Sequence, residues 1–296
     1  MKGYEQPHLH GKTFSHFNEP WRKIVNSEGI GKPILEIHQL TKTFGEVTAV
    51  NSLTISLASG EAFGLLGPNG AGKTTVIKML TTLLPPTSGS ASIAGFDVVH
   101  KASTVRRFIG YVPQLLSADG ALTGYENLKV FARLYDIPRA ECSSRISDAL
   151  EFMGLSDVSD ALVRTYSGGM IRRLEIAQSM LHRPQILFLD EPTVGLDPTA
   201  RHAVWERIGQ LRADYGTTIL LTTHYMDEAE HLCDRVAFMH LGRVTAIGTP
   251  AELKASIGNN GATLDDVFEH YTGGTLKEGE SYRETARTRR TTRRFS

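Results

Sequence analysis

Hydrophobic positions recur with two different spacings along this chain, and the spacings separate expected strands from expected helices. Residues 34–37 and 53–57 have the composition of strands, and the second segment alternates strictly between apolar and polar side chains. Gly45 and Gly60 interrupt the pattern close to these segments, as turn residues do. We therefore predict an antiparallel β layer near the start of the regular pattern.

The next segments combine an apolar run with helical spacing. The run 61–66 leads into a glycine-rich loop, and a helical pattern follows over 73–84, where two prolines would end the helix. Between about Leu122 and Val163, apolar residues recur every three or four positions. This spacing indicates a helical insertion, which we place at about residues 115–165.

Helices and strands then alternate along the chain. We expect a helix starting at Ser167, a strand over 186–189, a helix around 204–211 and a strand over 218–221. Continuous apolar strands that alternate with helices are typical of a parallel sheet buried on both faces. The predicted fold class is α/β, a P-loop NTPase core with a mainly parallel sheet, an antiparallel β subdomain and a helical insertion.

Length, composition and charge limit the number of domains and set apart the two ends of the chain. Its 296 residues include 32 Lys plus Arg and 32 Asp plus Glu, which suits one large α/β domain or two smaller ones. Residues 1–32 lack a sustained period, and we interpret them as a polar N-terminal extension. Residues 275–296 form a basic tail, with seven basic and three acidic residues from Lys277 onward.

The remaining body of the chain is slightly acidic, because the total net charge is zero and the tail is basic. This balance argues against a surface dedicated to nucleic acid, which would carry a basic face. We interpret the tail as a solvated terminus. The alternative is that it contacts anionic lipid or RNA.

The cysteines and the apolar segments indicate the cellular environment that we expect for this chain. Cys142 and Cys233 are the two cysteines, and neither lies in a Cys-x-x-Cys pattern, so we expect a reduced environment and no structural metal. The sequence has no apolar stretch of the roughly 18 residues that a membrane helix needs. It also has no apolar centre of a secretory signal near its start. We expect that the chain does not cross a membrane alone.

The segment GPNGAGKT, residues 67–74, matches the phosphate-loop pattern G-x-x-x-x-G-K-S/T between an expected strand and an expected helix. Glycines allow backbone N–H groups to turn toward phosphate oxygens, and the helix N-terminus adds its positive end. Lys73 would contact the β and γ phosphates, and the Thr74 hydroxyl would bind Mg²⁺. The expected nucleotide ligands here are Gly67, Pro68, Asn69, Gly70, Ala71, Gly72, Lys73, Thr74 and Thr75. The loop alone leaves the choice of nucleotide open, since GTPases and kinases use it too.

Two adjacent carboxylates end the apolar strand at 186–189. Asp190 is expected to hold Mg²⁺, and Glu191 to orient or deprotonate the water that attacks the γ phosphate. Two acidic residues that merely cap the following turn are the alternative. His224 ends the second apolar strand, and we expect it to contact the γ phosphate rather than to be only a satisfied polar residue.

A further motif makes the set diagnostic of one family. The residues Tyr166-Ser167-Gly168-Gly169-Met170 open a helix about twenty residues before Asp190, and Gly195-Leu196-Asp197-Pro198 follows Glu191. With the phosphate loop and His224, this ordered set resembles the ATP-binding subunit of ABC transporters. The resemblance spans roughly residues 33–274, which we take as the ABC-type ATP-binding domain.

The resemblance implies a role for each matching residue. Its cofactors would be ATP and Mg²⁺, and Lys73, Glu191 and His224 would be the catalytic residues. The signature residues Ser167, Gly168 and Gly169 would hold the γ phosphate of ATP bound by a second copy of the subunit. The remaining assignments are Asp197 at that dimer interface, Gln114 as a sensor and ligand of Mg²⁺ that also links ATP to the membrane subunit, and Phe44 stacked on adenine. The motif departs from its commonest form, Leu-Ser-Gly-Gly-Gln, at Tyr166 and Met170.

Two more segments point to a branch of that family. Residues 122–128 and 131–135 resemble the helical insertion of daunorubicin-resistance-type exporters, and residues 263–268 resemble the closing segment of that branch. The implied function is a peripheral ATPase on the cytoplasmic face of the cell membrane. It would power a separate permease that exports a drug, an antibiotic or another small substrate, without nucleic acid as a partner.

Two other functions remain as alternatives. A non-transport ATPase of the same superfamily, acting on DNA or ribosomes, would usually insert long coiled coils, zinc motifs or a second ATPase unit, and this sequence has none of them. A small-molecule kinase with a phosphate loop would leave residues 167–169 without a role.

Overall fold

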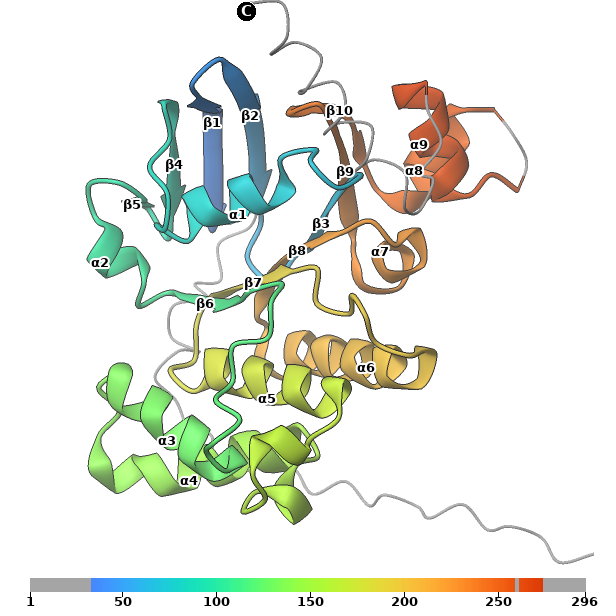
Figure 1. Cartoon of the computed structure of the whole chain (residues 1–296). Helices are drawn as coiled ribbons and strands as arrows, with labels where there is room; N and C mark the ends of the chain where they lie inside the picture. Colours follow the sequence, from blue (N-terminus) through green and yellow to red (C-terminus); the bar gives the residue numbers. More distant parts are fainter. Residues whose placement is uncertain (1–32, 259–260, 274–296) are drawn as a thin grey trace, which may run out of the picture. The chain divides into compact units, whose positions relative to one another are not determined.

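The computed structural model describes residues 33–258 and 261–273. The predicted N-terminal extension and basic tail therefore lie outside the described residues. Two sheets pack against opposite sides of helix α1, Lys73–Leu80 (Figure 1).

The antiparallel layer is confirmed, and the alternating sequence pattern explains it. Its four strands run in the order β2-β1-β4-β5. In β2, Leu53, Ile55 and Leu57 are buried while the residues between them are exposed, so one face of the layer packs on the core. The bounds are β1 Leu35–Phe44, β2 Val47–Leu57, β4 Ser88–Ile93 and β5 Phe96–Asp97.

The second sheet has six strands in the order β10-β9-β3-β8-β7-β6. All neighbouring pairs are parallel except β9 with β10. Every residue of β3, β7 and β8 is buried, which confirms the expectation from their continuous apolar sequences. The bounds are β3 Ala62–Leu66, β6 Ile109–Val112, β7 Ile186–Asp190, β8 Thr218–Thr223, β9 Arg235–His240 and β10 Arg243–Gly248.

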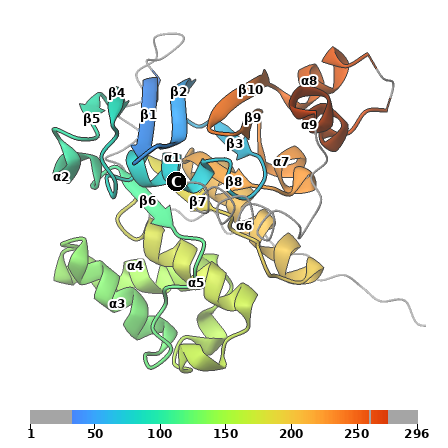
Figure 2. The same ribbon diagram turned by 45° about the horizontal axis from the view of Figure 1, so that its top comes forward.

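The core lies on both faces of this sheet. Along β7, Ile186 and Phe188 join the cluster shared with the antiparallel layer and α1, while Leu187 and Leu189 join the cluster shared with α5 and α6. Successive strand residues point to opposite faces, so one apolar run supplies both clusters. Figure 2 shows the same division, with α3, α4 and α5 on the side of the sheet away from β1 and β2.

Helices account for most of the remaining described chain. The helical periodicity between Leu122 and Val163 is confirmed as two helices and two short 3-10 turns. The bounds are α1 Lys73–Leu80, α2 Ala102–Val105, α3 Gly124–Leu134, α4 Arg139–Phe152, η1 Ser156–Val158, η2 Val163–Thr165, α5 Gly168–Met180, α6 Pro198–Tyr215, α7 Met226–Leu232, α8 Pro250–Ser256 and α9 Leu264–Thr272.

Two helix lengths differ from the sequence-based expectation. Helix α1 ends at Leu80 rather than residue 84, because Thr82 adopts a left-handed conformation with φ of 64° that a helix cannot continue. Helix α6 is longer than 204–211: the Asp197 side chain caps its start, and Gly216 ends it with φ of 63°. The expected range had covered only its apolar face.

A stacked pair of rings joins the end of α3 to the start of β6. Tyr135 lies against His182 with ring centroids 3.8 Å apart, and the His182 Nε2–H donates to the Ile109 carbonyl at 2.8 Å. Burial lowers the pKa of His182 to about 4. The folded protein therefore holds this imidazole neutral over a pH range in which an unfolded chain would protonate it.

We expect the stability of the protein to rise with pH between about 4 and 6.5, because only the unfolded chain binds a proton on His182 in that range. The contribution is at most about 3 kcal/mol. Urea unfolding midpoints between pH 4.5 and 7.5 measure it. The H182Q variant can still donate to Ile109 but does not titrate, so its midpoint should change less with pH than that of the wild type. Equal pH dependence in the two proteins would contradict the assignment.

Candidate functional site

The phosphate-loop sequence forms a tight turn between β3 and α1. Gly67, Gly70 and Gly72 have φ values of 151°, 85° and 110°, in the region that favours glycine. A β-carbon on Gly67 would collide with the Met239 carbonyl oxygen, and one on Gly72 with the Ala49 carbonyl oxygen. The loop is therefore packed against the neighbouring backbone on one side, while Asn69 and Gly70 are exposed on the other.

Lys73 opens α1 and is almost fully buried. Its Nζ donates to the carbonyl oxygens of Gly67 at 2.7 Å and Pro68 at 3.2 Å. The same Nζ lies 3.0 Å from Oε1 of Glu191. The loop's own backbone thus directs this ammonium toward the end of β7.

Asp190 gathers two hydroxyl groups at the end of β7. Oδ1 accepts hydrogen bonds from Thr74 Oγ1 at 3.1 Å and Thr222 Oγ1 at 2.6 Å. Burial raises the pKa of Asp190, although both hydroxyl groups act in the opposite direction. A hydroxyl and a carboxylate are the hard oxygen ligands that Mg²⁺ prefers, so this pair fits that cation. Among the described residues, no cluster of three or more His, Cys, Asp or Glu side chains could hold a metal ion.

Glu191 and His224 form a second pair, one strand apart. His224 Nδ1 lies 2.7 Å from Oε2 of Glu191, and Glu191 is 4% exposed. Burial acts to raise the pKa of Glu191, but the His224 and Lys73 contacts outweigh it and lower the pKa. Glu191 is therefore an ionised carboxylate at neutral pH, the state that a general base requires.

The backbone of Glu191 is strained. Its φ of 49° lies in the left-handed region, which is unfavourable for a residue with a side chain. The Glu191 N–H donates to both the carbonyl oxygen and Oγ1 of Thr222, at 3.0 and 3.1 Å. Strained residues of this kind cluster at functional sites, and the bonds to Thr222 hold this one in place.

The remaining predicted site residues lie elsewhere on the chain. Ser167 and Gly168 are exposed at the start of α5, where Ser167 Oγ accepts from the Met170 N–H at 3.3 Å. Asp197 is exposed at the start of α6 and accepts from the Ala200 N–H at 2.9 Å. Between the described residues, no hydrogen bond or ion pair links Ser167 or Asp197 to the phosphate loop.

Phe44 and Gln114 are also separate from the Lys73 cluster. Phe44 ends β1, is 49% exposed, and has Lys42 Nζ 5.2 Å from its ring centroid. Gln114 is exposed just after β6. Thr75 lies half-buried on α1.

Tyr166, where the commonest motif has Leu, is buried and makes a polar contact that Leu could not. Its hydroxyl donates to the Val158 carbonyl oxygen at 2.6 Å. A β-carbon on Gly124 would collide with this hydroxyl, so the glycine at the start of α3 provides the room that the tyrosine needs. The departure thus affects packing between α5 and the helices before it.

An ion pair that the sequence analysis missed holds the backbone around Gln114. Arg172 and Glu175 on α5 are each 2% exposed at their side chains and lie 3.0 Å apart. Arg172 donates to the carbonyl oxygens of Pro113 at 2.7 Å and Gln114 at 2.8 Å. Glu175 Oε1 accepts from the backbone N–H and, at 3.1 Å, the hydroxyl of Ser117. The pair thereby fixes the segment 113–117 to the helix that begins at Ser167.

We expect R172A to lower the free energy of unfolding by about 3–5 kcal/mol, because it leaves the Glu175 carboxylate buried without a cation. The double variant R172M/E175Q removes both charges and keeps an acceptor for Ser117, so it should recover more than half of that loss. Chemical unfolding of the three proteins measures both effects. A single variant as stable as the wild type would show that the pair does not hold this segment.

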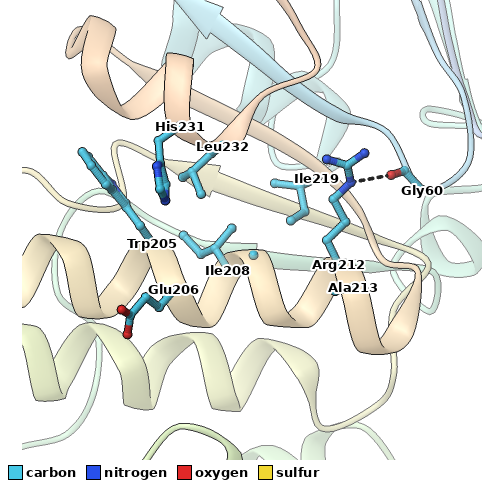
Figure 3. A pocket seen from close by; sticks show the side chains of 10 residues that line it. Gly60, Trp205, Glu206, Ile208, Arg212, Ala213, Ile219, His231 and Leu232 are labelled. Atoms are coloured by element: carbon cyan, nitrogen blue, oxygen red, sulfur yellow. Dashed lines mark hydrogen bonds between the residues drawn. The ribbon is translucent and has the colours of Figure 1, made fainter.

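A cavity of about 530 Å³ lies between α6, α7 and Gly60 (Figure 3). Its apolar lining includes Trp205, Ile208 and Leu232. Arg212, which also lines the cavity, donates to the Gly60 carbonyl oxygen at 2.9 Å. None of the predicted site residues lines this cavity.

The glycine loop before a helix, with an Asp-Glu pair and a histidine at the ends of the adjoining parallel strands, places the protein among the P-loop nucleoside triphosphatases. The chain belongs to the ABC transporter family, whose sequence profile matches residues 50–194. The branch expected from the sequence is confirmed by its relatives.

The daunorubicin/doxorubicin resistance ATP-binding protein DrrA of Streptomyces peucetius is 48% identical over 226 residues, covering 76% of this chain and 68% of the relative. The Nod factor export ATP-binding protein I of Ralstonia nicotianae is 47% identical over 226 residues, covering 76% and 70%. A solved ATP-binding subunit of an ABC transporter is similar with a TM-score of 0.72 and 33% identity, over 81% of this chain and 99% of that one.

The family membership settles the general activity. The protein is an ABC-type ATPase, the ATP-binding and ATP-hydrolysing subunit of an ABC transporter. The predicted fold, the P-loop core of ABC ATPases, is confirmed by the same solved structure. A non-transport ATPase acting on DNA or ribosomes is not favoured by these relatives. Each helix of the described part is too short or too polar to pass through a bilayer.

Proposed function

We propose that this ATPase works in a head-to-tail pair with a second copy of itself and drives a separate membrane permease that exports a small drug-like substrate. The observation that carries the proposal is the division of the predicted ligands into two sets. Lys73, Asp190 and Glu191 form one connected cluster, whereas Ser167 and Gly168 are exposed at the start of a different helix.

The exposed start of α5 is suited to an anion supplied by another molecule. Backbone N–H groups and the helix dipole favour negative charge at this end of a helix. A γ phosphate held by Lys73 of one copy would meet Ser167 of the other. Hydrolysis would remove that bridge, so ATP would bias a two-state pair.

Within one copy, each residue of the cluster would have a separate task. Lys73 would bind the β and γ phosphates, and Glu191 would accept a proton from the attacking water while His224 holds its carboxylate in place. Thr74 and Asp190, with Gln114 as a further ligand, would hold Mg²⁺, which would neutralise the charge of the transferred phosphate. Phe44 would stack on the adenine ring.

Exposed apolar side chains after Gln114 and on α3 support a membrane partner. Leu115 and Leu116 are 81% and 51% exposed, and they follow Gln114 directly. Leu134 and Val130 on α3 are 71% and 44% exposed. Leu115 and Leu116 are adjacent in sequence, and Val130 and Leu134 lie one helical turn apart. Exposed apolar patches mark interaction sites. We assign the permease contact, on the cytoplasmic face of the cell membrane, to these two segments. By analogy with the two relatives, we expect the substrate to be exported.

We expect a membrane permease to be encoded beside this gene, and copurification of the two proteins tests the proposal. We expect the two proteins to form a stable complex in detergent and to show ATP turnover that rises with specific amphipathic compounds. The double variant L115D/L116D should lose the complex while its own ATP binding stays unchanged. A wild-type chain that never joins the membrane protein, and stays monomeric with Mg-ATP, would contradict the proposal.

A further inference from the structure

Glu228 on α7 is a buried carboxylate outside the cluster described above. It has no exposed surface. Its Oε1 accepts hydrogen bonds from Thr193 Oγ1 at 2.8 Å and from Trp205 Nε1 at 2.9 Å. Burial raises the pKa of Glu228, and its second oxygen, Oε2, has no hydrogen-bond partner among the described residues. Burying a carboxyl group is costly, so this one calls for an explanation.

Glu228 and its two partners belong to segments that carry or adjoin predicted site residues. Thr193 lies two residues after Glu191, and Glu228 itself lies four residues after His224, on the helix that follows β8. Trp205, which also lines the cavity in Figure 3, belongs to α6, the helix that Asp197 caps. One carboxylate on α7 therefore binds the turn after β7 and the side of α6.

A second contact joins the same segments. The Arg201 guanidinium on α6 lies 4.3 Å from the Tyr225 ring centroid, and its NH1 atom lies 3.6 Å from Oδ2 of Asp227. Helix α6 is thus attached to the residues on both sides of Met226. Trp205 and Thr193 are buried, so their donor groups have few other acceptors within reach.

We propose that Glu228 is a positioning residue for hydrolysis, whose carboxylate fixes the turn after Glu191 against α7, the helix that follows His224, and so sets the contact between Glu191 and His224. This inference rests on the proposed function, because it takes Glu191 and His224 as the hydrolytic pair. Their side chains come from different strands and meet at 2.7 Å. A displacement of about 1 Å in such a pair can lower a rate about 100-fold.

The proposal predicts an effect on turnover rather than on nucleotide affinity. No hydrogen bond joins Glu228 to the phosphate loop or Lys73 within the described residues. Loss of its carboxylate should therefore disturb the Glu191 region and leave ATP binding in place. A purely structural role would instead lower the melting temperature without changing kcat of the folded protein.

Steady-state kinetics of full-length variants test the proposal with Mg-ATP. We expect E228A to lower kcat by about 10-fold to 100-fold, with KM changed by less than about threefold. In E228Q the amide oxygen can still accept from Thr193 and Trp205, so kcat should stay within about threefold of the wild type. The control E230Q, which alters an exposed neighbour on the same helix, should match the wild type.

The isosteric variant T193V keeps the test decisive if E228A does not fold. It removes one donor to Glu228 without a large change in volume, and its kcat should fall by about threefold to tenfold. The proposal is wrong if folded E228A or T193V turns over like the wild type, if KM rises instead, or if E228Q loses as much as E228A. E191Q is measured in parallel: normal turnover there would refute the proposed function, whereas inactive E191Q with fully active E228A would refute only the role of Glu228.

Discussion

Replacing Glu191 with Gln should lower steady-state ATP turnover by about 100-fold to 10,000-fold, because the amide cannot accept the proton of the attacking water. ATP binding should persist. In the structure Glu191 Oε1 lies 3.0 Å from Lys73 Nζ, so the neutral amide frees more of the lysine's positive charge for a phosphate. The bound nucleotide would then remain uncleaved between two copies, and the pair should stay associated.

Phosphate release and size-exclusion chromatography with Mg-ATP measure the two parts of this prediction. We expect E191Q to elute as a dimer with Mg-ATP and as a monomer without nucleotide. The control E206Q changes an exposed carboxylate on α6 and should keep wild-type turnover. An E191Q protein with normal turnover would remove Glu191 from the chemistry.

The second large effect is expected for Lys73→Ala, in the affinity for ATP itself. The Lys73 ammonium lies at the phosphate loop with Gly67, Pro68 and Glu191 as its partners. Its loss would remove the cation that faces the triphosphate and leave the Glu191 carboxylate to repel it. We expect ATP affinity to fall by at least about 30-fold, the lower end for truncating one side of a buried charged contact.

Titration with a fluorescent ATP analogue measures this affinity. Lys78 provides a matched control, because it lies on the same helix and is exposed. K78A should bind ATP like the wild type, since its ammonium is not directed at the loop. Equal affinities of K73A and the wild type would contradict the phosphate-loop assignment.

The strands that were predicted correctly have hydrophobic patterns that follow from burial alone. The strict alternation in β2 and the continuous apolar runs of β3, β7 and β8 follow from burial on one face or on two. Helix ends were harder to place. Thr82 ends α1 through its backbone conformation, which the apolar spacing of the following leucines did not reveal, and Leu83 is in fact 62% exposed.

Strands β9 and β10 were not anticipated at all. β10 has no fully buried residue, because it lies at the edge of the sheet, and its sequence therefore lacks a long apolar run. Its pairing with β9 across the short turn at residues 241–242, rather than an apolar pattern of its own, defines it as a strand. β5 is missed for a similar reason, because it has two residues and pairs with β4 across a short turn.

Sequence motifs identified the residues of the nucleotide site, but they did not identify the buried charged residues that support it. Lys73, Asp190, Glu191 and His224 meet because the ends of three parallel strands lie side by side. Arg172, Glu175 and Glu228 were missed, because charged residues on a helix normally face solvent. A signal was present for one pair: Arg172 and Glu175 are spaced three apart, so they lie on one face of α5 and can pair there.

The left-handed backbone at Glu191 has a consequence for attempts to make this protein more heat-resistant. Glycine at that position would relieve roughly 1 kcal/mol of conformational cost and would stand out in any screen for thermal tolerance alone. A variant selected in this way would be more stable but would lack the proposed general base. Glu191 should therefore be excluded from stabilising mutagenesis.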